Sequence, residues 1–226
     1  MVQPTTLPPQ VRGEWIPMTY EEFLDWSEGK HAEWVDGAGM IFVTSNERHV
    51  RFLLLFTNLL SAYVDLFQLG RVIPAPFQMR LDVRPSGREP DLMVVLTEHL
   101  DRVRRNWLEG PADFVVEFIS EHTADNDLKV KLLEYEAAGV PEFLTVETRE
   151  GRDGVRFIRL DEHGRYQPIV SDERGRLHSL VLPGFWFDPA WFERQPSPST
   201  DQLLLQIAPE PYRHYLMKLL AEDRGE

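Results

Sequence analysis

Two short, almost uninterrupted apolar segments constrain the fold of this chain more than any other feature. They are residues 92–96 (LMVVL) and residues 114–119 (FVVEFI). A strand with one solvated face alternates apolar and polar residues, whereas a strand covered on both faces is apolar throughout. The two segments are therefore predicted to be central strands of a sheet that has other elements packed on both of its faces.

Amphipathic segments elsewhere in the chain can provide those covering layers. Residues 47–68 carry large apolar side chains at three- and four-residue steps, and residues 124–138 form a second helical segment that ends at Gly139. Further strands are predicted at residues 72–83, where two prolines would bend the chain, and at residues 142–146. This order indicates an α/β (α+β) fold in which helices flank a mixed central sheet.

The amino-terminal region has two recognisable local signals. Thr19 is followed three residues later by Glu22, which is the pattern of a capping box at the start of a short helix. The Asp-Gly pair at positions 36–37 lies between apolar segments at residues 32–35 and 40–43. Because Asp-Gly supports the positive backbone angles of a tight turn, these segments are predicted to form a hairpin.

Composition divides the chain into four segments. Residues 1–18 are expected to form a flexible lead-in, and residues 19–193 the main domain, which includes an added antiparallel meander at residues 154–181. Residues 194–208 begin with RQPSPST, a sequence typical of a linker, and residues 209–226 are predicted to be a C-terminal helical appendage. The total of 226 residues fits one domain with such an appendage.

Two carboxylates occupy segments that should be buried. Asp91 follows Pro90 at the start of the first apolar segment, and Glu117 interrupts the second. An isolated buried anion costs several kcal/mol unless a cation, hydrogen-bond donors or a raised pKa compensates for its lost hydration. We therefore expect compensating groups close to both acids.

The helical pattern predicts that Lys131 is the cation close to these acids, because it shares an inward-facing stripe with Leu132 and Tyr135. One interpretation is a structural ion pair, in which Lys131 or an arginine neutralises Glu117 while Asp91 points to solvent. The other is a site for a hard metal ion. Two carboxylates and a backbone carbonyl suit Mg²⁺, and a nearby lysine can help to deprotonate a water molecule that attacks phosphorus.

Six motifs also follow one another along the chain. They are HAEWVDG (31–37), Arg48-His49, EPDLMVV (89–95), VVEFIS (115–120), DLKVKLLEY (127–135) and AGVPEFLTVE (138–147). In their order and spacing these motifs resemble the large bacterial family of putative restriction endonucleases, which is part of the PD-(D/E)XK nuclease superfamily. The resemblance extends from about Thr19 to Phe192.

The resemblance implies a restriction-endonuclease-like core with a metal-dependent site for phosphodiester cleavage. Asp91 matches the family's Pro-Asp carboxylate and Glu117 matches the acid on the next core strand, so these two residues are the implied metal ligands. The superfamily motif has a lysine two residues after that acid, where this chain has Ile119, and Lys131 on the following helix matches the lysine instead. Glu33 is implied as a further acid that supports the metal or its water.

Other residues near the motifs have less specific roles. His49 matches a histidine often seen at the start of the long helix, although a cap or surface role is commoner for such a residue, and Tyr135 is expected in the core. The family usually has Ser-Pro after the second acid, with two residues between that acid and the serine. This chain has Ser120-Glu121-His122 there, and the extra acid would alter the affinity for metal or phosphate.

The charge balance limits the partners of the protein. A net charge of −13 argues against broad electrostatic adhesion to DNA, and scattered arginines such as Arg88 and Arg102 are typical of a solvated face. The absence of cysteine excludes disulfides, zinc–thiolate sites and iron–sulfur clusters, and favours a cytoplasmic protein. No apolar run approaches the roughly 20 residues of a membrane-spanning helix, so no membrane partner is expected.

Two functional hypotheses follow. The first is an endonuclease that hydrolyses DNA phosphodiester bonds with Mg²⁺, or with Mn²⁺ in its place, using the four residues Glu33, Asp91, Glu117 and Lys131. The second is a catalytically inactive nuclease-fold module that binds nucleic acid or a protein partner. In that case the apolar stripe of the helix at residues 209–222 could pair two copies as a homodimer.

Overall fold

The computed structural model describes most of the chain, and gaps separate the described segments. These segments are residues 14–28, 30, 32–41, 46–83, 86–119, 125–149, 151–152 and 154–223. Most of the predicted lead-in, and the Ser120-Glu121-His122 departure from the family pattern, lie outside the described residues.

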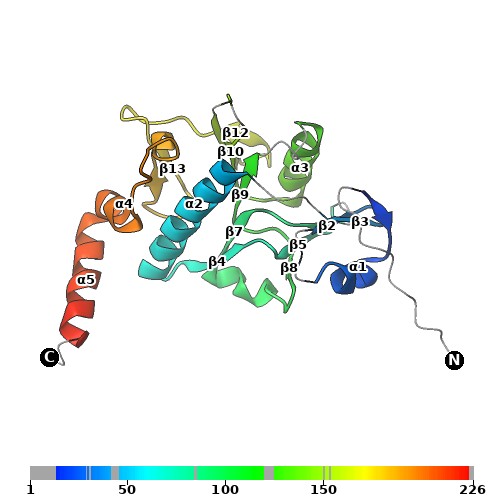
Figure 1. The fold of residues 1–226 in the computed structure, drawn as a ribbon, viewed down its shortest axis with the longest axis horizontal. Helices are drawn as coiled ribbons and strands as arrows, with labels where there is room; N and C mark the ends of the chain where they lie inside the picture. The colour runs from blue at the N-terminus through cyan, green and yellow to red at the C-terminus, as the bar shows by residue number, and fades with distance from the viewer. Residues whose placement is uncertain are drawn as a thin grey trace.

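A six-stranded mixed sheet, the central sheet, forms the middle layer of the molecule (Figure 1). Its strands lie in the order β12-β11-β10-β9-β7-β4. Their bounds are β4 Gly70–Pro74, β7 Leu92–Leu96, β9 Phe114–Ile119, β10 Glu142–Glu147, β11 Val155–Leu160 and β12 Tyr166–Pro168. Strands β9 and β10 are parallel, and the other neighbours are antiparallel. The predicted interior strands β7 and β9 are confirmed, and so is the antiparallel addition of β11 and β12.

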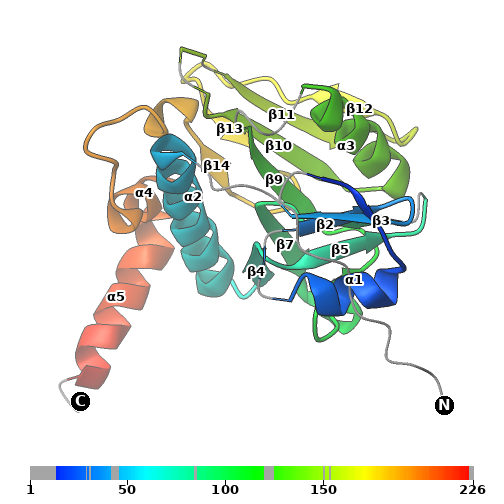
Figure 2. The same cartoon turned by 45° about the vertical axis from the view of Figure 1, so that its right-hand side comes forward.

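Helices cover both faces of the central sheet, which explains why β7 and β9 are apolar throughout. Helix α2 (Glu47–Leu66) packs on one face, against a cluster that includes Val94 and Val116, and α3 (Asp125–Ala138) packs on the other, against Met93 and Val115. Figures 1 and 2 show the two helices on opposite sides of the strands. Side chains of successive strand residues therefore enter different cores. Glu117 shares the α3 side with Val115.

A second six-stranded sheet, the amino-terminal sheet, lies beside the first (Figure 2). Its order is β1-β3-β2-β6-β5-β8. Its strands are β1 Ile16–Pro17, β2 Ala32–Val35, β3 Ala38–Ile41, β5 Gln78–Leu81, β6 Ser86–Arg88 and β8 Trp107–Glu109. The predicted class, mixed sheet structure flanked by helices, is confirmed, but the strands are divided between two sheets instead of forming one.

The division into two sheets explains a difference at residues 72–83. The single bent strand predicted there is two strands, β4 and β5, which belong to different sheets. Pro74 and Pro76 interrupt the segment, and proline has no backbone N–H to donate to a ladder. The chain therefore leaves the edge of the central sheet at Pro74 and joins the amino-terminal sheet at Gln78.

The local signals near the amino terminus are confirmed. Thr19 caps helix α1 (Tyr20–Trp26) in a complete capping box with Glu22, and Asp36 and Gly37 both have positive φ in the turn between β2 and β3. The second strand of this hairpin, Ala38–Ile41, begins slightly earlier than predicted, and residues 42–43 of the prediction lie outside the described residues. Ile16 and Pro17, at the end of the predicted lead-in, pair with β3 as strand β1.

The carboxyl-terminal region differs from the prediction at residues 194–208. Helix α4 (Thr200–Ile207) lies within the predicted linker, because Ser199 and Gln202 form a capping box and Leu203 and Leu204 enter the core.

The remaining elements are two short 3₁₀-helices (Thr97–Arg102 and Pro189–Trp191), a two-stranded ribbon of β13 (Leu177–His178) and β14 (Trp186–Phe187), and helix α5 (Pro209–Asp223). Helix α5 projects from α4 away from the sheets (Figures 1 and 2). Within the described residues, no helix combines the length and apolar content needed to cross a bilayer.

Candidate active site

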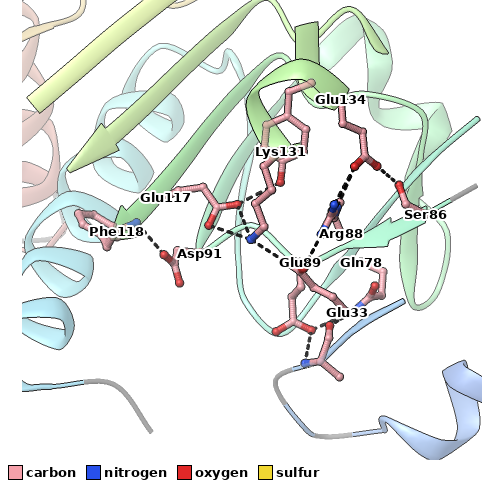
Figure 3. Close-up of polar contacts among 12 residues, drawn as sticks. Glu33, Gln78, Ser86, Arg88, Glu89, Asp91, Glu117, Phe118, Lys131 and Glu134 are labelled. Atoms are coloured by element: carbon pink, nitrogen blue, oxygen red, sulfur yellow. Dashed lines mark hydrogen bonds and ion pairs between the residues drawn. The ribbon is translucent and has the colours of Figure 1, made fainter. Parts of the chain in front are cut away.

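The strand register brings Asp91 alongside Glu117. Strands β7 and β9 pair Leu92 with Val116, so the next position joins Asp91 and Glu117. Asp91 is buried, and its Oδ2 accepts a 2.7 Å hydrogen bond from the backbone N–H of Phe118, the residue after Glu117 (Figure 3). The alternative in which Asp91 points into solvent is therefore wrong.

His49 contacts the other oxygen of Asp91. Its Nε2 lies 3.5 Å from Asp91 Oδ1, and its ring packs edge-on against Phe118. The histidine is positioned at the start of α2, where Asn46 Oδ1 accepts the backbone N–H of His49 as the helix cap. His49 is thus buried beside the candidate site, and not on the surface.

Lys131 joins two of the predicted acids. Helix α3 directs its side chain between the two sheets, where Nζ lies 2.6 Å from Glu33 Oε1 and 3.2 Å from Glu117 Oε1 (Figure 3). All three side chains are buried. The inward-facing stripe predicted from Leu132 and Tyr135 therefore brings the ammonium to Glu117, whereas position 119, where the superfamily motif has its lysine, is an isoleucine.

Glu117 lies in a strongly desolvated position. Its Oε1 also accepts a hydrogen bond from the hydroxyl of Tyr135, at 3.0 Å. Burial, to which the charges of Asp91 and Glu33 add and which Lys131 only partly offsets, raises the pKa of Glu117 to about 8. Burial and the neighbouring charges of Glu117 and Glu33 likewise raise the pKa of Tyr135, so this core tyrosine remains a hydrogen-bond donor.

Glu33 is held by two cations. Oε1 faces Lys131, and Oε2 accepts a 2.8 Å hydrogen bond from Arg88 Nη1. Burial alone would raise the pKa of Glu33, but Lys131 and Arg88 outweigh it and hold the pKa below its usual value. The side chain was predicted to support a metal or its water, and it reaches the other site residues through Lys131.

Arg88 and Glu134 complete this buried network, and sequence reasoning missed both. Glu134 Oε2 accepts from Arg88 Nε at 3.0 Å and Nη2 at 2.9 Å, and Glu134 Oε1 accepts from the hydroxyl of Ser86. Arg88 is only 2% exposed, so its assignment to a solvated face was wrong. The available signal was an imbalance of charge, because three acids in buried segments outnumbered the one lysine placed near them.

The donor set fits a hard divalent cation. Among the residues that the structure describes, no three His, Asp or Glu side chains come together as a ready-made metal cluster. Glu134, Arg88, Glu33 and Lys131 alternate in charge and balance one another. This leaves Asp91 and Glu117. Once Glu117 releases its proton, the two carboxylates match one divalent ion that would take its remaining ligands from backbone carbonyl and water, as Mg²⁺ commonly does.

A further buried carboxylate, Glu89, lies at the edge of the site. Glu89 Oε2 accepts hydrogen bonds from the side-chain amide of Gln78, at 2.9 Å, and from the backbone N–H of Ala32, at 3.2 Å (Figure 3). Since Ala32 precedes Glu33, these bonds tie the strand that carries Glu33 to the segment that leads to Asp91.

Comparison with known proteins gives one family and several solved structures. The family model Uma2, described as "Putative restriction endonuclease", matches residues 20–190. None of the curated proteins matches the chain.

A solved structure shares the fold. It is described as a "putative nuclease belonging to DUF820" from Anabaena variabilis ATCC 29413, and superposes with a TM-score of 0.63 at 14% sequence identity. The match covers 78% of the present chain and 97% of the other. At this level of identity the likeness concerns the fold, and it agrees with the mixed sheets and helices described above.

Proposed function

Since the chain belongs to the Uma2 family of restriction endonuclease-like proteins, we propose that it is a Mg²⁺-dependent endonuclease that hydrolyses phosphodiester bonds of DNA. The observation that carries the proposal is the meeting of Glu117 and Lys131 beside Asp91, in a buried position between two sheets. A purely structural ion pair needs one acid for each cation. Here Arg88 balances Glu134 and Lys131 balances Glu33, so among the described residues Asp91 and Glu117 have no cation of their own to balance them.

Asp91 and Glu117 are the proposed metal ligands. Bound there, Mg²⁺, or Mn²⁺ in its place, would polarise the scissile phosphate and lower the pKa of a coordinated water. The Phe118 N–H orients Asp91 and the Tyr135 hydroxyl orients Glu117, so both carboxylates are fixed before any ligand arrives. Such neighbouring contacts commonly set the affinity of a metal site.

Lys131 is the proposed residue for positioning the attacking water, to which its ammonium would donate a hydrogen bond. Its ammonium lies 3.2 Å from Glu117 Oε1, and it can also stabilise negative charge that develops on the phosphate. Glu33 keeps the ammonium at a fixed place, 2.6 Å from its own carboxylate. This role accords with a catalytic contribution of Glu33 without direct contact between Glu33 and the metal.

The proposed substrate is DNA, and the cytoplasm is the proposed location because DNA is accessible there and the chain has no cysteine. With a net charge of −13, the protein must bind DNA through a local surface.

The test is a cleavage assay on single-stranded, double-stranded and branched DNA with Mg²⁺ or Mn²⁺. We expect cleavage by the wild type and losses of about 100-fold or more in Asp91→Asn, which removes a proposed metal ligand, and in Lys131→Ala, because the loss of one donor that stabilises charge in the transition state costs about this much. Lys129→Ala is the matched control, since Lys129 is exposed on the same helix. Equal cleavage by Lys129→Ala and Lys131→Ala would refute the proposal.

The alternative remains a non-catalytic module that binds nucleic acid or a protein partner, and the exposed apolar side chains of α5 favour its dimeric form. Met217 and Leu220 are 71% and 60% exposed. Sedimentation of wild type and of a Met217→Glu/Leu220→Glu variant tests for pairing through this helix. A module without catalysis would bind no Mn²⁺ in a calorimetric titration. The endonuclease would bind Mn²⁺, and the Glu117→Gln variant would lose this binding.

A further inference from the structure

Arg88 occupies an unusual position for an arginine. It lies on β6 of the amino-terminal sheet, it is 2% exposed, and its guanidinium contacts one acid from β2 and one from α3. Burying a guanidinium costs several kcal/mol unless its donors are satisfied. Here Nη1 donates to Glu33, while Nε and Nη2 donate to the same oxygen of Glu134.

The contacts place Arg88 one step behind Lys131. Glu33 divides its two oxygens, one to Arg88 at 2.8 Å and one to Lys131 at 2.6 Å. Glu134 lies three residues after Lys131 on α3, so the two side chains leave neighbouring positions on one helix face. Arg88 therefore fixes Lys131 twice, through the carboxylate that faces its ammonium and through the helix that carries it.

We propose that Arg88, anchored by Glu134, is the positioning residue that sets where the Lys131 ammonium lies between Glu33 and Glu117. This inference rests on the proposed function for its catalytic consequence, but its geometric part does not. Without the guanidinium, Lys131 would be the one cation left for the buried carboxylate of Glu33. Its ammonium would then shift within the space between Glu33 and Glu117. With it, Glu117 keeps the longer contact, 3.2 Å, and stays available to a ligand.

A lysine cannot replace Arg88 in this role. The two acids are engaged by separate edges of a planar, rigid fork, whereas an ammonium is a point charge on a flexible stem. Arg88→Lys conserves the charge and removes the fork, and Glu134→Gln conserves the shape of the anchor and removes its charge. Together the two variants separate the effect of the guanidinium's geometry from the effect of the charge that anchors it. Arg71→Lys on β4 and Glu136→Gln on α3 are the controls, because neither residue contacts Glu33 or Lys131 in any described hydrogen bond or ion pair.

The catalytic test measures kcat and KM separately. For Arg88→Lys and Glu134→Gln we expect kcat to fall by about 10-fold to 100-fold, the usual cost of losing a partner that orients a site residue. KM for DNA and the calorimetric Kd for Mn²⁺ should stay near the wild-type values, and the controls should change nothing. A kcat equal to wild type in a folded Glu134→Gln variant, or a parallel loss of metal binding, would overturn the assignment.

A second readout needs no catalysis. The chain has four lysines, Lys30, Lys129, Lys131 and Lys218, and only Lys131 is buried. In protein labelled with ¹⁵N-lysine, the Lys131 ammonium should give a separate, slowly exchanging NMR signal that shifts or broadens in Glu134→Gln and not in Glu136→Gln.

The two readouts separate the inference from the function on which it rests. If the wild type cuts no DNA but the Lys131 signal responds to Glu134→Gln, the positioning role stands and the proposed function fails. If the signal is unchanged in that variant, the positioning role fails whatever the enzyme does. Glu134→Gln also serves where Arg88→Lys does not fold, since it removes no packed atoms.

Discussion

Glu117 is the residue whose ionisation should be visible in the stability of the protein. Burial, together with Asp91 and Glu33, raises its pKa from 4.5 to about 8, so the folded protein binds a proton that the unfolded chain releases. The contribution of this acid to the free energy of unfolding is therefore fully present below pH 4.5 and is lost as the pH rises through about 8. The loss is at most about 1.4 kcal/mol for each pH unit in that interval.

Denaturant unfolding in the presence of a chelator measures this effect. We expect the wild type to lose more stability than Glu117→Gln between about pH 5 and pH 8, because glutamine keeps the contact with Tyr135 and cannot ionise. Equal losses in the two proteins would mean that Glu117 is already ionised near neutral pH.

At the residue scale, sequence reasoning found the acids and the lysine but missed the network that holds them. Asp91, Glu117 and Lys131 were visible because each breaks a local apolar pattern. Arg88 and Glu134 were not, because β6 has only three residues, too few to define a pattern, and Glu134 is one of several acids on α3. Their roles depend on contacts across 46 positions of sequence, which local periodicity does not encode.

Among the elements, α1 offers a direct test of a local signal. The hydroxyl of Thr19 accepts the backbone N–H of Glu22 at 3.2 Å, and the Glu22 carboxylate accepts the N–H of Thr19 at 2.9 Å. Thr19→Ala should lower the free energy of unfolding by about 1 kcal/mol, while Thr19→Ser should change it little. Thermal unfolding measures both, and an alanine variant as stable as the serine variant would show that the cap contributes nothing.

Elements with strong local signals were predicted well, and those determined by tertiary pairing were not. Helix α3 ends at Ala138, directly before Gly139, whose positive φ allows the chain to turn, as its sequence indicates. The separation of β4 from β5 and the helix within residues 194–208 depend on which sheet or core the segment joins. A proline predicts an interruption in a strand, but it does not indicate which sheet the next strand joins.

For the whole molecule, a bound divalent ion should stabilise the fold. Binding to the native state alone adds about 2.7 kcal/mol when the free ion is at a hundredfold excess over its Kd. In a chain of this length that is an increase in Tm of about 5 to 10 °C. The measurement is thermal unfolding with Mg²⁺ or Mn²⁺ at constant ionic strength. A similar increase in Asp91→Asn would assign the effect to the acidic surface instead of the site.

The same acidic surface sets the way in which DNA should bind. A net charge of −13 permits few simultaneous contacts with phosphates, and each neutralised phosphate adds about −0.9 to the slope of log affinity against log salt concentration. Binding of double-stranded DNA by Lys131→Gln, at constant Mg²⁺ and varied KCl, should therefore give a shallow slope of about −3, and removal of Mg²⁺ should weaken it further. The substitution keeps both proposed metal ligands while it slows cleavage during the titration. A slope of about −6 or steeper would require an extended basic surface, and the excess of acids would then have to be confined to the opposite face of the molecule.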